Sequence, residues 1–169
     1  MTEAMVVDTN ILEHVFDPTI NGDGHVDSLL RKFSEQRRKL CVDRPPENQR
    51  SRILNEYKHR LDFHSRQIEE RGQLAQWLRY LVEYAERVDT IVDLSDRLGG
   101  LLVPLMDRVR AERSDQVFVY VACALDSVMV SNNRRHVTDL RKVLRRAART
   151  AVGSKQTDFI SSLQAEAAL

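Results

Sequence analysis

Short apolar runs recur along the chain, separated by longer stretches in which apolar residues follow a helical spacing. Charged or turn-forming residues bound each run, which is typical of strands covered on both faces. Three of these runs, predicted as strands, are Met5–Val7, Lys39–Asp43 and Val128–Ser131; Val88–Leu94 is predicted as a strand because its residues alternate. The sequence therefore predicts four strands.

The stretches between these runs place apolar residues three and four positions apart, which predicts amphipathic helices. The most apolar helix follows Ser114, a favoured N-cap residue. The predicted helices are Asn10–Phe16, Val26–Lys39, one from Glu47 through Leu61, Leu74–Ala85, Ser95–Arg110, Ser114–Ser127 and a basic helix after Ser131. We expect Thr157–Ala168 to form a last helix or a frayed tail.

Strands that alternate with helices predict a parallel sheet with helices on both faces. We therefore expect the α/β class, as a three-layer α/β/α sandwich with a central, mostly parallel four-stranded sheet. The chain is long enough for one domain with a real hydrophobic core, so residues 1–169 are expected to form a single domain. Its expected loose ends are residues 1–4 and about 154–169, frayed or, at the C-terminus, an added helix.

The composition agrees with a soluble globular protein, because 42% of the residues are apolar and 30% are charged. The longest apolar run falls far short of the ~20 residues that a membrane span requires, so we expect no membrane association. No basic segment followed by an apolar one opens the chain, and no signal peptide is expected. Cys41 and Cys123 lie in apolar contexts, which favours buried, reduced thiols and a cytoplasmic location.

Positive charge is concentrated in one segment, although the whole chain carries only +1. Seven lysines and arginines and a single acid, Asp139, lie between Arg134 and Arg149. That segment has a net charge of +6, which leaves −5 for the remainder. It is either a face that binds a polyanion or a solvated helix face.

Four polar residues are candidates for a site, because ligands of open parallel sheets gather beyond the carboxyl ends of the strands. Asp8 follows the first predicted strand, and Asn133 lies just past the fourth. Asp115 falls in the first turn of the most apolar helix, and Glu56 lies within the helix "RILNEYKHRL". A folded α/β domain would be able to bring these four together.

Each candidate also has a purely structural explanation. Asp8 is a favoured N-cap for the helix that follows it. Glu56 is placed to pair with Arg60 one turn later, and acids such as Asp115 are favoured in any first helical turn. Asn133 belongs to an "NN" pair that suits a tight turn.

The chain contains, in order, the segments "VVDTNIL", "ILNEYKHRL", "SDQVFVYVACAL" and "VMVSNNRRHV". Together they resemble the ordered motifs of the PIN domain, a metal-dependent nuclease fold. The resemblance is piecewise and extends from Met5 to about Val137. Four motifs in the correct order, each on the expected type of element, are more specific than any one of them.

The resemblance implies that Asp8, Glu56 and Asp115 are the carboxylates that bind Mg²⁺ or Mn²⁺. These hard cations prefer oxygen ligands, and acids crowded together repel one another until a divalent ion neutralises them. The ion then lowers the pKa of a bound water and balances the charge that develops on a phosphodiester during hydrolysis.

The resemblance assigns supporting roles to Asn10 and Ser131, which would orient the Asp8 carboxylate. It also exposes a departure, because PIN domains usually carry an aspartate where this chain has Asn133. An amide still offers a carbonyl oxygen but brings no charge. We therefore expect a one-metal site, or a second metal held weakly, and slower cleavage.

The function that follows from the resemblance is a metal-dependent ribonuclease acting on single-stranded or loop RNA. Many bacterial PIN proteins of this size are toxins of toxin–antitoxin pairs, which implies a small antitoxin or other protein partner and a homodimer. The alternative is a catalytically weak or inactive PIN fold that binds RNA or acts as a scaffold; a DNA nuclease is a third. The residues expected to bind RNA are Arg134, Arg135, Arg141, Arg145 and Arg146.

Overall fold

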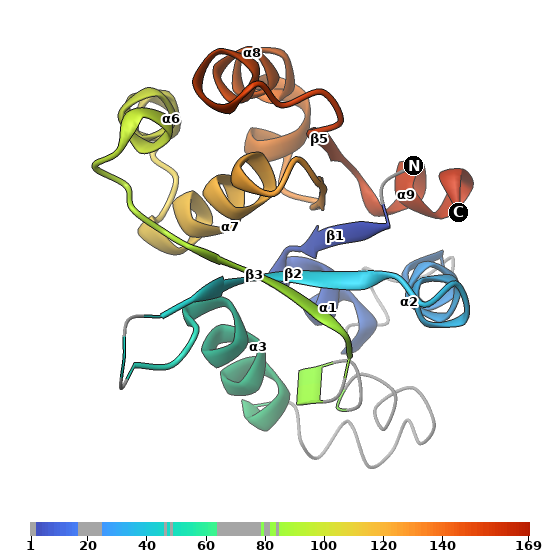
Figure 1. Cartoon of the computed structure of the whole chain (residues 1–169). Coiled ribbons are helices and arrows are strands. Elements are labelled where there is room, and N and C mark those ends of the chain that lie inside the picture. The colour runs from blue at the N-terminus through green and yellow to red at the C-terminus, as the bar shows by residue number, and fades with distance from the viewer. Residues whose placement is uncertain are drawn as a thin grey trace.

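The computed structural model describes residues 3–16, 25–45, 47, 49–63, 79, 82–83 and 85–169. The helix predicted over Leu74–Ala85 lies almost entirely outside the described residues. Within the described part, the chain alternates strands and helices from β1 to α9 (Figure 1).

The centre of the protein is a five-stranded, all-parallel sheet with the strand order β3-β2-β1-β4-β5. Its strands are β1 (Ala4–Val7), β2 (Lys39–Arg44), β3 (Arg87–Ile91), β4 (Val128–Val130) and β5 (Asp158–Ile160). The chain builds outward from β1 to β3 and then crosses to the other side of β1. The strand order thus reverses between β1 and β4, which is where open α/β sheets bind ligands.

The fifth strand corrects the sequence-based prediction of four. Thr157–Ala168 was expected to be a helix or a frayed tail, but residues 158–160 pair with β4 and only Ser162–Ala168 forms helix α9. Strand β4 is equally short but wholly apolar, whereas this strand begins on a charged residue, Asp158, and has only two apolar residues. Ser161 ends the strand and caps α9 by accepting a hydrogen bond from the Gln164 N–H.

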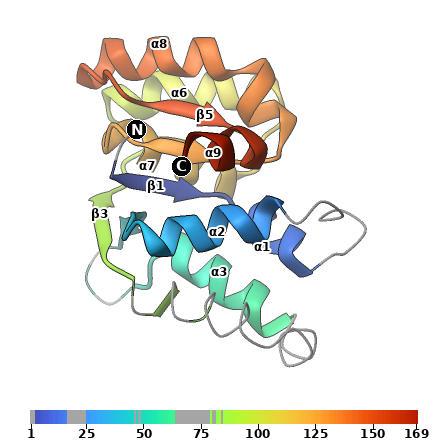
Figure 2. The same cartoon turned by 90° about the vertical axis from the view of Figure 1, so that its right-hand side faces the viewer.

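Helices cover both faces of the sheet, which confirms the α/β fold class and the predicted sandwich (Figures 1 and 2). Helices α6, α7 and α8 lie on one side of the sheet, and α1, α2 and α3 lie on the other. The bounds of the helices are α1 (Thr9–Phe16), α2 (His25–Glu35), α3 (Arg52–Phe63), α6 (Arg97–Arg108), α7 (Arg113–Ala124) and α8 (Arg141–Val152). The basic segment forms a π-helical turn, η1 (Arg135–Asp139), before α8.

Several helices begin one or more residues from the predicted start, and for two of them the structure gives the reason. Helix α3 starts at Arg52 instead of Glu47, because the Asp43 carboxylate at the end of β2 accepts the N–H groups of Arg52 (2.8 Å) and Ile53 (2.9 Å). Helix α7 has Glu112 as its N-cap, so Ser114 lies inside the helix. Acids near the start of a helix satisfy N–H groups that have no partner within it.

The core lies between the sheet and the two helix layers. Strand β1 is buried along Met5–Val7, and the middle of α7 is buried as predicted from its apolar run. Tyr57 of α3 is core, with its ring 6.0 Å from that of Phe118 and its hydroxyl donating to the Val7 carbonyl. Burying one such aromatic stabilises the fold by about 1.5–3 kcal/mol.

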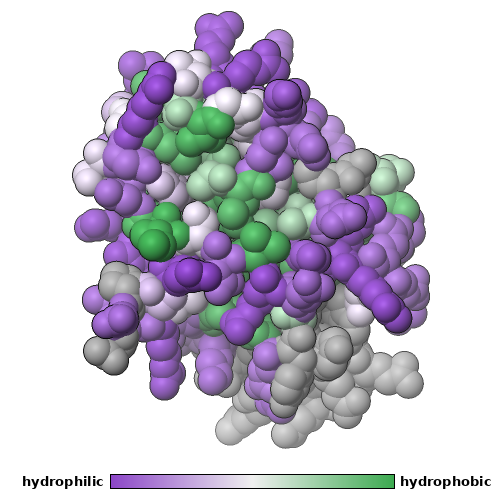
Figure 3. All heavy atoms as spheres, in the orientation of Figure 1, coloured by the Kyte–Doolittle hydropathy of each residue, from purple (hydrophilic) through white to green (hydrophobic). Residues whose placement is uncertain are grey.

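The outer side of the sheet at β3 is the least covered. Exposed and half-buried residues alternate along this edge strand, and the Ile91 side chain is 66% exposed. Figure 3 shows apolar residues grouped among hydrophilic ones on this side of the molecule. Among the described helices, none is both long and apolar enough to cross a membrane.

Candidate functional site

Asp8 lies at the carboxyl end of β1, beside β4, and is only 4% exposed. Its Oδ2 accepts hydrogen bonds from the Ser131 hydroxyl (2.6 Å) and from the Asn10 side-chain amide (3.0 Å). The same Asn10 nitrogen lies 3.2 Å from the Ser131 oxygen, so the three side chains form a closed network. The carboxylate is therefore fixed by the two residues that the sequence suggested for this task.

Asp8 also contributes to the start of α1. Its backbone carbonyl accepts the Ile11 N–H at 3.0 Å, and its Oδ1 lies 3.4 Å from the Asn10 backbone nitrogen. The second distance is long for a hydrogen bond, whereas the contact to Ser131 is short. Capping of α1 thus does not explain why Ser131, directly after β4, donates a hydrogen bond to the Asp8 carboxylate.

Glu56 extends from α3 toward the same edge of the sheet. Its Oε1 accepts a hydrogen bond of 2.7 Å from the Thr9 hydroxyl, one residue after Asp8. Arg60 forms its ion pair with Glu13 (2.9 Å) and not with Glu56, which is hydrogen-bonded to Thr9. The structural explanation of Glu56 as the partner of Arg60 is therefore wrong.

Burial raises the pKa of Glu56, and the negative charges of Asp8 and Asp115 raise it further. The Thr9 hydrogen bond and the Arg60 charge act in the opposite direction without cancelling the rise. Carboxylates influence one another in this way only when they share a region of low screening. The fold therefore brings Asp8, Glu56 and Asp115 to one region from three distant parts of the chain.

Asp115 keeps a structural task as well. It lies in the first turn of α7, where its Oδ2 accepts the Glu112 N–H at 3.1 Å. A carboxylate there also benefits from the positive end of the helix dipole. Asp115 is half-buried, at the margin of the site.

Asn133 is used mainly to build the turn after β4. Its backbone N–H donates to the Ser131 hydroxyl (3.0 Å), and its side-chain oxygen accepts the Arg135 N–H (3.0 Å). These contacts match the structural explanation given above. They also link the turn to Ser131 and, through Ser131, to Asp8.

The donor chemistry of the site fits a hard divalent cation, because Asp8, Glu56 and Asp115 offer only oxygen. The spacing fits less closely. Among the described residues, no three acidic, histidine or cysteine side chains are gathered tightly enough to form a metal-binding group. The site is thus a loose group of carboxylates of which one, Asp8, is firmly oriented.

The sequence analysis missed three residues that position the site. Thr9 orients Glu56, and its place directly after Asp8 was the available signal. Asp43 is the penultimate residue of β2, and it fixes the first turn of the helix that carries Glu56. Asn132 accepts hydrogen bonds from Ser162 (both 2.9 Å) and ties β4 to α9; no motif pointed to it.

The basic segment is only partly available to a ligand. Arg141 forms a two-pronged ion pair with Asp158 (both contacts 2.7 Å), and Arg145 lies 3.9 Å from the same carboxylate. Burial would raise the pKa of Asp158, but the hydrogen bonds and charge of Arg141 lower it overall. Arg134 lies 3.7 Å from Asp139, and both side chains are largely exposed.

Two of the proposed RNA-binding arginines are less constrained. The Arg135 and Arg146 side chains are exposed, and neither has a hydrogen bond or ion pair with another residue in the described part of the chain. Arg141 is thus the least suited of the five to contact a ligand.

Comparison with known proteins adds no assignment. No known protein-family profile matches the chain, and no curated protein matches its sequence. The likeness to the PIN domain therefore rests on the four sequence motifs alone.

Proposed function

We propose that the protein is a metal-dependent ribonuclease whose carboxylates Asp8, Glu56 and Asp115 bind Mg²⁺ or Mn²⁺. The observation that carries the proposal is the network of Asp8, Asn10 and Ser131 where the strand order reverses, with Glu56 hydrogen-bonded to the adjacent Thr9. A buried carboxylate held in one orientation, with like charges nearby, is typical of a site that works with a cation.

The residues have separable tasks in this proposal. Asp8 is the fixed ligand, and Asn10 and Ser131 restrict its orientation. Glu56 and Asp115 add negative charge from the two flanking helices. A divalent cation bound there supplies an activated water and charge neutralisation for phosphodiester hydrolysis.

A second candidate function is an RNA-binding or scaffold protein without turnover. Two observations favour it. The Asn133 side-chain oxygen accepts a hydrogen bond within a turn, and among the described residues no three potential ligands are close enough together to form a metal-binding group. The exposed arginines that follow Ser131 would serve this function equally well.

The resemblance to bacterial toxins extends the proposal to cellular context. A small antitoxin or another protein partner, a homodimer and a cytoplasmic location all belong to this hypothesis. The two cysteines are buried and free, which agrees with a reducing compartment. Burial raises the pKa of Cys41 to about 11, so its thiol stays protonated and unreactive.

Restoring the fourth carboxylate separates the two functions. With Mn²⁺ present, Asn133→Asp should increase cleavage of a fluorescent single-stranded RNA on the order of tenfold, because a charged ligand strengthens cation binding. Asn55→Asp is the matched control, since it makes the same change at an exposed residue of α3. If wild type and Asn133→Asp both bind RNA without cutting it, the binding function holds and the nuclease is rejected.

A crystal soaked with Mn²⁺ provides an independent test that does not depend on turnover. The nuclease proposal expects anomalous density beside the Asp8 carboxylate. Density elsewhere, or none at this position while RNA is being cut, would place the metal site in another part of the protein.

A further inference from the structure

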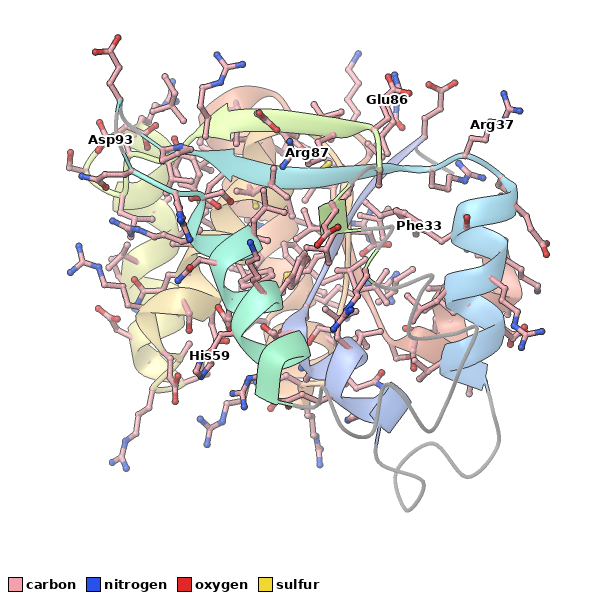
Figure 4. The ribbon with its side chains drawn as sticks, turned by 90° about the horizontal axis from the view of Figure 1, so that it is seen from below. Phe33, Arg37, His59, Glu86, Arg87 and Asp93 are labelled. Carbon is pink, nitrogen blue, oxygen red and sulfur yellow. The ribbon has the colours of Figure 1, made fainter. Side chains whose placement is uncertain are left out.

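The first turns of α3 and α7 border a hollow of about 390 Å³ at the carboxyl edge of the sheet. Its lining residues are Arg52, Arg113, Ser114 and Val117. Both helices begin on the left in Figure 1, on the side toward which the strands point. In Figure 4 this edge is marked by Asp93, which follows β3, whereas Arg37 precedes β2 at the opposite end.

The two arginines of the hollow differ from those of the basic segment. The Arg52 and Arg113 side chains are exposed, and neither guanidinium has a hydrogen bond or ion pair with another described residue. Arg141, by contrast, is neutralised by Asp158. Two positive groups that flank one hollow repel each other, and among the described residues neither is neutralised by an ion pair.

The hollow adjoins the proposed metal site through its own helices. Asp115 follows Ser114 in α7, and Glu56 lies one turn beyond Arg52 in α3. Helix α3 also packs against α7, so the two first turns keep a fixed relation. The backbone of Arg52 is held by the Asp43 carboxylate, which leaves its side chain to project from an anchored position.

We propose that Arg52 and Arg113 form a phosphate-binding subsite that holds the backbone of an RNA strand next to the carboxylates. This inference rests on the proposed function, and it adds the residues that position the substrate. Guanidinium groups match phosphate oxygens in charge and geometry, and Ser114 adds a hydroxyl donor. A phosphodiester carries one negative charge, which two arginines neutralise without any cation.

The test measures binding without cleavage. A fluorescent single-stranded RNA is titrated with protein in EDTA over a series of salt concentrations, with Arg52→Gln/Arg113→Gln as the test variant. Arg31→Gln/Arg37→Gln is the matched control, because it removes the same charge from exposed arginines on and just after α2 (Figure 4). Glutamine removes the charge and keeps an unbranched polar side chain, and thermal unfolding verifies that both variants fold.

For single strands, each neutralised phosphate contributes a slope of about −0.7 to the logarithm of affinity against the logarithm of salt. Because the subsite neutralises one phosphate, the slope of the test variant should be shallower by about 0.7, so that between about 50 and 200 mM salt it loses roughly 2.6-fold less affinity than wild type. The control should keep the wild-type slope. Equal slopes for test and control variants, or a wild type that binds no RNA, would overturn the subsite.

A DNA strand of the same sequence sharpens the assignment. Phosphate contacts do not involve the 2′-hydroxyl, so the test variant should lose the same slope on DNA and on RNA. A loss confined to RNA would contradict a phosphate subsite. If arginine-dependent binding is present while no metal produces cleavage, the subsite stands and the nuclease alone fails.

Discussion

Carboxylates at the two opposite edges of the sheet are held in contrasting ways. Asp126, between α7 and β4 at the amino edge, accepts the Ser154 hydroxyl (2.6 Å) and the N–H groups of residues 155, 156 and 157 (3.0, 2.7 and 2.8 Å). Burial alone would raise the pKa of Asp126, but these donors lower it to about 2. The charge of Asp126 is thus satisfied by the protein itself.

At the carboxyl edge, the balance is reversed. The pKa of Glu56 is raised, first by burial and then by the charges of Asp8 and Asp115, and its Thr9 hydrogen bond does not compensate. The Asp126 carboxylate is thus compensated by donors, whereas Glu56 lies near like charges of the kind that a cation would neutralise. The contrast therefore separates a structural acid from one candidate ligand, Glu56, by their surroundings.

The largest expected effect comes from Asp8→Asn. This change keeps the shape of the side chain and its place beside Ser131 but removes the charge, so RNA cleavage with Mn²⁺ should fall at least about 100-fold, equivalent to ~2.7 kcal/mol. The thermal unfolding midpoint should remain close to that of wild type.

Asp126→Asn is the matched variant at the other edge, where the same chemical change should leave cleavage per folded molecule unaltered. Rates are compared after correction for the folded fraction at the assay temperature. Equal losses in both variants would show that the surroundings of a carboxylate do not distinguish the two classes.

The next effect concerns stability and its pH dependence. Because the pKa of Asp126 is about 2 in the folded state and 3.8 in the reference state, the folded state binds fewer protons between these values. Its contribution is complete above about pH 4 and is lost as the pH falls toward 2. After allowance for solvent screening, Asp126→Asn should lower the free energy of unfolding by about 1–2 kcal/mol near pH 7.

Urea unfolding at several pH values measures this contribution. The difference between wild type and Asp126→Asn should shrink from about pH 4 downward. Asparagine tolerates the left-handed backbone of residue 126 (φ 48°), so the variant introduces no new strain. Asp89→Asn removes a charge from an exposed position on β3 and should have no comparable effect.

The sequence was most informative where chemistry follows directly from position along the chain. An acid directly after an apolar run had to lie at the carboxyl edge of a parallel sheet, and this placed Asp8 correctly. The contacts of Asn10 and Ser131 to Asp8 agreed with the motif. Local order is sufficient for such features, because strand direction alone fixes the edge.

Features that depend on packing between distant segments could not be predicted from the sequence. The basic run suggested that Arg141 was available, because its partner Asp158 begins a strand too short to be predicted. The hollow of Arg52 and Arg113 arises only when α3 packs against α7, and these residues are far apart along the chain. The number of arginines in a segment can be counted from the sequence, but whether an arginine can bind a ligand depends on the ion pairs that it forms in the folded protein.

The smallest expected effect tests the electrostatic side of the comparison through Thr9. In the wild type, the hydrogen bond from the buried Thr9 hydroxyl lowers the pKa of Glu56. Thr9→Val keeps the shape of the side chain but removes this hydrogen bond. The pKa of Glu56 should rise further, so the acid limb of the profile of kcat/KM against pH should move to higher pH. Since one hydrogen bond is lost, cleavage on that limb should fall about two- to tenfold, while the plateau at higher pH changes little. Thr9→Ser retains the hydroxyl and should keep the wild-type limb; an unmoved limb in Thr9→Val would mean that ionised Glu56 takes no part in the reaction.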